Sequence, residues 1–247
     1  MENIFKFALA GIAAIILSSS LTTSTAQGRL AFEGTYAVTG KTPDAAAYSG
    51  TMTIVPYGQG YRITQVFGIY AYYGIGTAVG NNQVGDFFVA AFLHENQPSL
   101  SLYAVTAANT LSSVWQDYNS TRRGIEESVL ANRSFSVLPS LPAQNNLDYS
   151  GTYRVAGTDS NGLAYTNGVY VSRSGSGYIA QRYTANNDAA LFGIGGKLDG
   201  FLVFAWNYNG VPRISVYEGN PDVDGKMAGF WQAYDALKRG SESVYPQ

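Results

Sequence analysis

Along most of the chain, hydrophobic and polar residues alternate with a period close to two, which is typical of β-strands with one buried and one exposed face. The clearest case is residues 165–173, which precede a Gly- and Ser-rich turn at 174–177 and a second alternating run at 178–183. This order predicts a β-hairpin. Residues 51–66 repeat the pattern, so we expect a second hairpin there.

Further short alternating runs follow each hairpin, separated by turn residues, and no window outside the N-terminus has a helical period. Counting an opening Gly-Thr-Tyr strand, each half of the chain offers about eight strands. The expected strands after the first hairpin are 72–79, 87–93, 99–105, 111–118 and 124–129, and those after the second are 191–198, 201–208, 213–218, 228–234 and 240–245.

Two separate motifs occur twice at nearly the same spacing. Gly-Thr-Tyr at 34–36 recurs at 151–153, an offset of 117 residues, and Trp115-Gln116 recurs as Trp231-Gln232, an offset of 116. A near-constant offset indicates a tandem duplication. We therefore expect two modules, at residues 32–132 and 149–247. The intervening residues 133–148, which contain Pro139 and Pro142, are expected to form a linker.

Eight sequential strands with short turns favour closed up-and-down barrels, because closure removes exposed sheet edges. Two β-sandwiches are the alternative. The opening Gly-x-aromatic and an Arg on the last strand resemble the calycin group of lipocalin-type and avidin-type barrels. That resemblance implies that Tyr36 packs under Arg123, and Tyr153 under Arg239, to plug one end of each barrel. The family has Trp where this chain has Tyr.

Glu126 and Glu242 are the acidic residues that both repeats keep, each within an Arg-Gly-x-Glu motif. Two interpretations are open. Each carboxylate is either a polar group inside a barrel or a partner of Arg or Lys on a neighbouring strand at the closing seam. The second is the expected one, so both residues are grouped with barrel closure.

The N-terminus has the features of a signal peptide. Lys6 precedes an apolar run at residues 7–17, and Ser24-Thr25-Ala26 supplies small residues for cleavage after Ala26. The run is too short for a membrane anchor, which is the alternative. We therefore expect residues 1–26 to be removed and the protein to be exported, to a periplasm or to the exterior.

Composition then excludes several function classes. The chain has no Cys, which rules out disulfides, thiolate nucleophiles and Cys-based metal sites. Its net charge is −2, with no long basic cluster, which argues against a nucleic-acid partner. The 19 Tyr, 28 Gly and 13% charged residues fit a compact exported β-protein.

The chain has few residues of the types that usually carry out catalysis. His94, the single histidine, falls in a polar stretch at the end of a predicted strand, and no nucleophile-elbow motif accompanies it. Residues 220–225 resemble half of a calcium loop, but the twelfth position is Trp231, so an ordinary turn is expected. We expect no enzyme activity, no cofactor and no metal site.

The aromatic residues are the best candidates for binding. Tyr70 and Tyr72 lie on one face of a strand, just before a Gly-Ile-Gly that recurs after Phe192. Together with Trp115 and Trp231 they are the predicted ligand-binding residues, for rings facing a lumen can hold an apolar ligand or stack on a sugar. The alternative is that the rings only fill a small barrel. The paired Gly-Ile-Gly predicts a bend or bulge.

Three functions remain open. The first is an exported, non-enzymatic binding protein for a small apolar or sugar-like ligand. The second is a structural or surface-interaction protein with solidly packed modules. The third is an outer-membrane barrel of 16 strands, which we do not expect, because the C-terminus lacks a terminal aromatic.

Overall fold

The computed structural model of the chain describes residues 32–80, 87–107, 109–131, 147–183, 189–198, 200–219 and 225–247. The predicted signal peptide, most of the predicted linker and residues 220–224 of the calcium-like segment lie outside these ranges. Every regular element of the described residues is a strand, and none is a helix that could cross a membrane.

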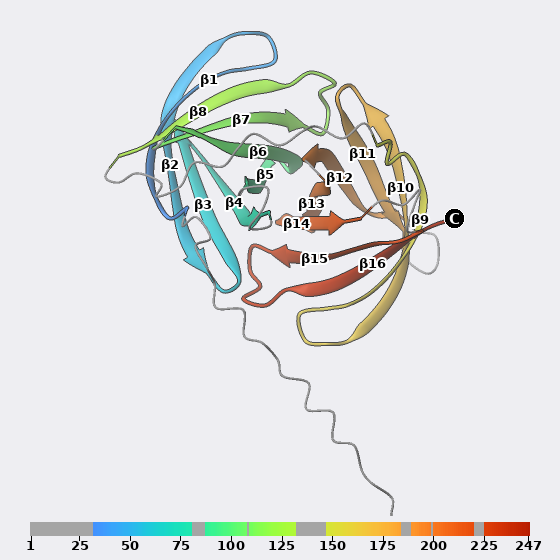
Figure 1. Cartoon of the computed structure of the whole chain (residues 1–247). Helices are drawn as coiled ribbons and strands as arrows, with labels where there is room; N and C mark the ends of the chain where they lie inside the picture. Colours follow the sequence, from blue (N-terminus) through green and yellow to red (C-terminus); the bar gives the residue numbers. More distant parts are fainter. Residues whose placement is uncertain are drawn as a thin grey trace, which may run out of the picture.

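Sixteen strands form two closed antiparallel barrels of eight strands each (Figure 1). The predicted fold class, all-β with two tandem up-and-down barrels, is confirmed. The strands of barrel 1 are β1 (Gly34–Lys41), β2 (Ala47–Tyr57), β3 (Gly60–Phe67), β4 (Tyr70–Val79), β5 (Phe87–His94), β6 (Gln97–Ala107), β7 (Thr110–Asp117) and β8 (Gly124–Leu130). Those of barrel 2 are β9 (Gly151–Thr158), β10 (Ala164–Ser174), β11 (Gly177–Tyr183), β12 (Ala189–Leu198), β13 (Phe201–Tyr208), β14 (Val211–Glu218), β15 (Met227–Ala233) and β16 (Gly240–Pro246).

Each barrel closes by pairing its first strand with its last. β1 pairs with β8 through Tyr36 opposite Leu130, and β9 pairs with β16 through Tyr153 opposite Pro246. The alternation of side chains along each strand puts every second residue inside, where the first barrel buries a cluster containing Tyr36, Met52 and Phe88. No sheet edge is left open, which is the physical advantage of closure.

One end of each barrel is plugged by the residue that leads into its first strand. The Tyr36 hydroxyl donates to the Phe32 carbonyl oxygen at 2.7 Å, and the Phe32 ring lies 5.0 Å from the ring of Phe88. In barrel 2 the Tyr153 hydroxyl donates to the Tyr149 carbonyl oxygen at 2.8 Å. The repeated tyrosine of the opening motif therefore holds the plug.

The pairing of Tyr36 with Arg123 that the calycin resemblance implies is wrong. Tyr36 lies opposite Leu130, at the end of β8, whereas Arg123 precedes the first residue of β8. Seven positions of strand separate the two ends, roughly 23 Å at about 3.3 Å per residue. Tyr153 and Arg239 are separated in the same way, because Tyr153 lies opposite Pro246 and Arg239 precedes β16.

The arginines instead bind the other barrel. The Arg123 guanidinium donates to the Ser176 carbonyl oxygen in the β10–β11 turn at 2.9 Å. Arg239 donates to the Gln59 carbonyl oxygen in the equivalent β2–β3 turn of barrel 1. Each barrel thus clasps a turn of its partner, and we call the two contacts the arginine clasps.

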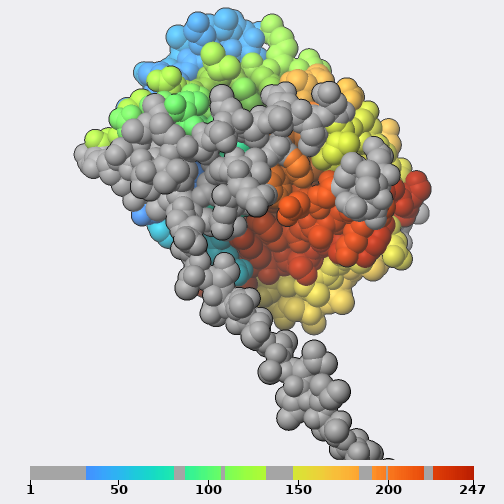
Figure 2. Space-filling model, viewed as in Figure 1, coloured from blue at the N-terminus to red at the C-terminus, as the bar shows by residue number. Residues whose placement is uncertain are grey.

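The barrels also share an apolar interface. The outer faces of β4, β5 and β6 pack against those of β12, β13 and β14, which lie at the centre of Figure 1. Ile75, Ala91 and Leu100 from barrel 1 form one buried cluster with Ile194 and Val203 from barrel 2. Figure 2 shows the blue-to-green and orange-to-red halves in direct contact. β4, β5 and β6 of barrel 1 are the equivalents of β12, β13 and β14 of barrel 2, so the same face of each barrel forms the interface. The arrangement is therefore that of a symmetric dimer whose two subunits are joined into one chain.

The Gly-Ile-Gly motifs do not form bulges. β4 keeps its register with β3 and β5 through Gly74 and Gly76. A Cβ on Gly76 would lie 2.5 Å from the Phe88 ring, and one on Gly193 would lie 2.5 Å from the Trp206 ring. These glycines therefore make room for large rings inside the barrels.

Candidate functional site

The lumen of barrel 1 contains an open cavity of about 230 Å³ at the end opposite the Phe32 plug. Five rings from five strands line its mouth: Tyr48, Phe67, Tyr72, His94 and Trp115. Their centroids are linked in sequence, Trp115 to Tyr48 at 6.4 Å, Tyr48 to Phe67 at 5.0 Å, Phe67 to Tyr72 at 6.0 Å and Tyr72 to His94 at 4.8 Å. We call this set the aromatic collar.

His94 belongs to the collar rather than to an isolated turn. It ends β5, and its Nε2 lies 3.1 Å from the Tyr72 hydroxyl, within hydrogen-bond distance. The sequence correctly predicted that His94 lies at the end of a strand. It did not predict the contact with Tyr72, because that contact joins two different strands, β4 and β5. The position of His94 fixes the Tyr72 ring at the mouth of the cavity.

Glu126 forms the polar floor of this cavity. Its carboxylate accepts hydrogen bonds from Tyr103 (2.9 Å), Tyr48 (3.1 Å), Gln65 (3.2 Å) and Ser128 (3.2 Å). Burial raises the pKa of Glu126, and the hydrogen bonds from Tyr103, Tyr48, Ser128 and Gln65 offset part of that rise. Glu126 thus occupies the lumen, which is the first of the two positions considered for it; the expected pairing with Arg or Lys is wrong here.

The two tyrosines that donate to this carboxylate have raised pKa values. Burial, followed by the charge of Glu126, raises the pKa of Tyr103 and that of Tyr48 well above their ordinary value. Both hydroxyls therefore keep their protons and act as donors at the floor of the cavity.

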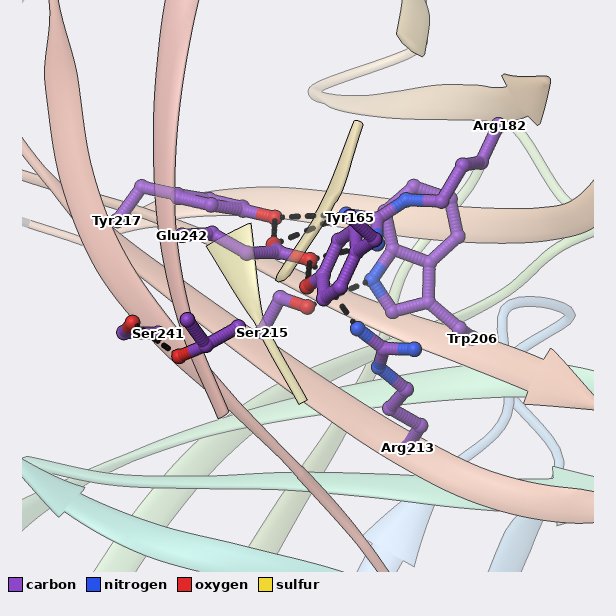
Figure 3. Close-up of polar contacts among 9 residues, drawn as sticks. Tyr165, Arg182, Trp206, Arg213, Ser215, Tyr217, Ser241 and Glu242 are labelled. Carbon is purple, nitrogen blue, oxygen red and sulfur yellow. Dashed lines mark hydrogen bonds and ion pairs between the residues drawn. The ribbon is translucent and has the colours of Figure 1, made fainter. Parts of the chain in front are cut away.

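Glu242 occupies the equivalent place in barrel 2, but arginines surround it (Figure 3). Arg182 donates to both carboxylate oxygens, at 2.6 and 2.9 Å, and Arg213 donates to one at 3.1 Å. Tyr165 and Tyr217 also donate to it. The arginines come from β11 and β14, across the lumen, and not from the neighbouring strands β9 and β15, so the expected seam pairing is corrected to a pairing through the interior.

The arginines decide the charge state of this second cluster. Burial opposes ionisation of Glu242, but the charges and hydrogen bonds of Arg182 and Arg213 outweigh it and lower the pKa to about 2. Burial alone would also lower the pKa of Arg182, yet Glu242 raises it above its ordinary value. The result is a buried ionised network.

Side chains of barrel 2 fill the deep part of its lumen. The guanidinium of Arg213 lies 3.7 Å from the Trp231 ring centroid, and that of Arg182 lies 5.2 Å from Trp206. The deep apolar half of the lumen leaves a void of only about 10 Å³. A hollow of about 490 Å³ remains at the mouth, lined in part by Tyr165, Arg213 and Trp231.

The predicted ligand-binding residues are therefore divided. Tyr72 and Trp115 line the cavity of barrel 1, and Trp231 lines the mouth of barrel 2. Tyr70 is 63% exposed and lies outside the set of cavity-lining residues. Phe192 lies on the outer face of β12, 6.1 Å from the Tyr118 ring in a groove between the barrels, so its placement in a lumen is wrong.

Sequence reasoning missed most of the polar lining. Gln65, Ser99 and Asp117 line the cavity together with Glu126. A signal was present, because Tyr48 and Tyr103 recur in barrel 2 as Tyr165 and Tyr217 at nearly the repeat offset. Within the described ranges, no group of three or more His, Cys, Asp or Glu side chains is arranged to hold a metal ion.

Comparisons with known proteins assign no family. No protein-family model matches the chain, and no curated protein matches it. A solved structure of a protein of unknown function from the DUF3598 family of Nostoc punctiforme is similar to it at 10% identity and a TM-score of 0.31, over 87% of this chain and 96% of that one. At this TM-score the similarity adds nothing to the functional argument.

Proposed function

We propose that the protein is an exported, non-enzymatic binding protein that takes one small apolar or sugar-like ligand in the lumen of barrel 1. The observation that carries the proposal is the open cavity of about 230 Å³ behind the aromatic collar. A cavity of about 150 Å³ is enough for benzene, so a ligand of the size of a substituted benzene or a small sugar ring fits. Rings at the mouth and hydrogen-bonding groups at the floor are the usual lining of such sites.

The finer relation to calycins is part of the same proposal. A closed eight-stranded meander, plugged at one end by its N-terminal segment and open at the other, supports a calycin-like use of the barrel as a ligand cup. Export rests on the signal features of residues 1–26.

A structural role fits barrel 2 better than barrel 1. Its lumen is occupied by Arg182, Arg213, Trp206 and Trp231, and its outer face is buried against barrel 1. We propose that barrel 2 mainly supports the binding barrel. The outer-membrane alternative is not proposed, because exposed outward positions on β1 and β8 include Thr35, Thr39 and Glu127, which do not suit a lipid-facing band.

Ligand binding is tested by titrating the mature protein with benzene derivatives and monosaccharides and following tryptophan fluorescence and calorimetric heat. We expect saturable binding of at least one compound and its loss in Ser101→Phe, because Ser101 lines the cavity and is 4% exposed. Ser112→Phe, on the outer face of β7, is the matched control and should keep binding. If no compound of the panel binds, or if Ser101→Phe leaves binding intact, the proposal is overturned.

A further inference from the structure

The two barrels are built around the same interior cluster, and the cross-strand register identifies its equivalent positions. Gln65 pairs with Met52 and Tyr72, and Arg182 pairs with Val169 and Leu191, at the same places of the two sheets. Gln65 is therefore the counterpart of Arg182.

The second arginine is matched in the same way. Ser99 lies opposite Asp117, two residues after Trp115, and Arg213 lies opposite Ala233, two residues after Trp231. Ser99 is therefore the counterpart of Arg213. Both cationic positions of barrel 2 are occupied in barrel 1 by smaller, uncharged side chains.

The carboxylate, the two tyrosines and one of the two indoles that contact the guanidinium groups in barrel 2 are nevertheless kept in barrel 1. The carboxylate is Glu242 in one and Glu126 in the other, and each accepts hydrogen bonds from two tyrosines. The indole that lies 3.7 Å from the Arg213 guanidinium, Trp231, has Trp115 as its counterpart at the wall of the cavity. Barrel 1 thus has the acceptors for a cation and an open space in place of the arginines.

The charged side chains around this space are mainly acidic. Of the described residues lining the cavity, Glu126 and Asp117 are acidic, His94 is the single basic type, and none is Lys or Arg. Arg122 is paired with Asp44 at the surface, and Arg123 is engaged by barrel 2. Asp117 has the uncharged Ala233 as its counterpart, so barrel 1 has a carboxylate where barrel 2 has a methyl group.

We propose that the ligand of barrel 1 is a small organic cation, with an ammonium or guanidinium head that binds Glu126 and an apolar body that the aromatic collar encloses. The head occupies the space that the arginine side chains fill in barrel 2, and it supplies the positive charge that a buried carboxylate requires. Trp115, Tyr48 and Tyr72 offer ring faces to the cation and to the body of the ligand. This inference rests on the proposed function and narrows its ligand to one charge class.

A charge series on one carbon skeleton tests it. Benzylamine, benzyl alcohol and benzoate are titrated into the mature protein at neutral pH by calorimetry. We expect benzylamine to bind at least about tenfold more tightly than benzyl alcohol, and benzoate not to bind. Glu126→Gln should remove the preference for the amine while keeping the affinity for the alcohol.

The decisive variant is Gln65→Arg, which gives barrel 1 the arginine that barrel 2 has. The new guanidinium should pair with Glu126, fill the cavity and lower benzylamine affinity by at least about a hundredfold. Thr64→Arg adds the same charge to the outward face of the same strand and should leave benzylamine affinity within about twofold. If Gln65→Arg does not fold, the charge series on the wild-type protein and on Glu126→Gln decides the question alone.

The outcomes separate the two proposals. Equal affinities for the amine and the alcohol, tighter binding of benzoate, or amine binding that Glu126→Gln does not weaken would overturn the cation inference while leaving ligand binding in place. Failure of all three compounds, together with saturable binding of another compound that Ser101→Phe abolishes, would also overturn the cation inference alone. Failure of every compound in both panels would remove the proposed function and the inference together.

Discussion

Glu126 and Glu242 show how far identical positions can differ in electrostatics. Both carboxylates are buried in a lumen and accept hydrogen bonds from two tyrosines. Burial raises the pKa of Glu126, whereas Arg182 and Arg213 lower that of Glu242 to about 2. The difference in pKa comes from Arg182 and Arg213, which contact Glu242, and not from the glutamates themselves.

Glu242→Gln should be strongly destabilising. The substitution leaves the buried guanidinium groups of Arg182 and Arg213 without a counter-charge, and removing one partner of a buried pair costs about 3–5 kcal/mol. Urea unfolding of the variant measures the loss. Glu126→Gln is the matched control and should cost far less, since none of the described residues that bind Glu126 is an arginine or a lysine. Equal losses in the two variants would contradict the account.

The two carboxylates should also respond to acid in opposite directions. Glu242 has a lowered pKa, so the stability that it contributes is complete above about pH 4.5 and is lost as pH falls toward 2. Glu126 has a raised pKa, so its contribution is complete below about pH 4.5 and is lost as pH rises through the raised value.

Without Glu126, the loss of stability that protonation of Glu242 causes at low pH should therefore be easier to measure. Between about pH 6 and pH 3, the free energy of unfolding of Glu126→Gln should fall more steeply than that of the wild-type protein. Urea unfolding at a series of pH values measures both slopes. Parallel curves would show that Glu126 does not titrate differently in the folded and unfolded states.

At the scale of the strand, the glycines of β4 and β12 decide which rings fit inside the barrels. Gly193 lies under Trp206, and Gly76 lies under Phe88, in positions where any Cβ would collide with the ring. The alternation of residues places a side chain inside, but the size of the cross-strand neighbour decides whether a large ring can lie flat on the sheet.

Gly193→Ala should cost about 1–3 kcal/mol in unfolding free energy, because the new Cβ would lie 2.5 Å from the Trp206 ring and force it to move. Gly168→Ala, on β10 of the same barrel, is the control. Its Cβ would meet its nearest neighbour at 3.9 Å, so stability should change by less than about 0.5 kcal/mol. If the two variants were equally stable, the glycine would have no role in packing.

At the scale of the whole molecule, the Arg-Gly-x-Glu motif serves three different neighbours at once. Arg123 clasps the other barrel, Gly124 lies against the Trp115 ring, and Glu126 points into the lumen. The motif is repeated in barrel 2, where Gly240 lies against Trp231. The pseudo-symmetric interface therefore depends on the same short segment as the binding site.

The clasped turns can be tested by glycine substitution. Gly58 has φ of +58°, and a Cβ there would lie 2.0 Å from the Leu237 carbonyl oxygen of barrel 2. Gly68 has φ of +61° with nothing within 4 Å of its Cβ position, so Gly68→Ala measures the backbone strain alone. Gly58→Ala should cost about 1–3 kcal/mol more in unfolding free energy than Gly68→Ala. Equal costs would mean that the two barrels do not press together at this turn.

Part of this architecture was predictable because it depends on local patterns. Alternation at 165–183 and the repeat of Gly-Thr-Tyr were enough to predict strands, hairpins and two modules, and the barrels confirm them. Phe192 could not be placed, because the pattern that puts one face of β12 inside does not say which face. The polar floor was missed since Tyr103, Gln65 and Glu126 come from three strands far apart in the chain.

The order of residues alone determined the all-β class, the duplication and the number of strands, because these follow from period, turn chemistry and self-similarity along one dimension. Only the tertiary structure decided that Arg123 and Arg239 join the barrels, and that the lumen of barrel 1 holds an open cavity while the deep part of the lumen of barrel 2 is filled. It also decided that Glu126 lies inside with no arginine among its described partners. These properties depend on which side chains meet across a closed sheet. Barrel closure brings together residues that are far apart in the sequence, and their separation in the sequence does not predict their distance in space.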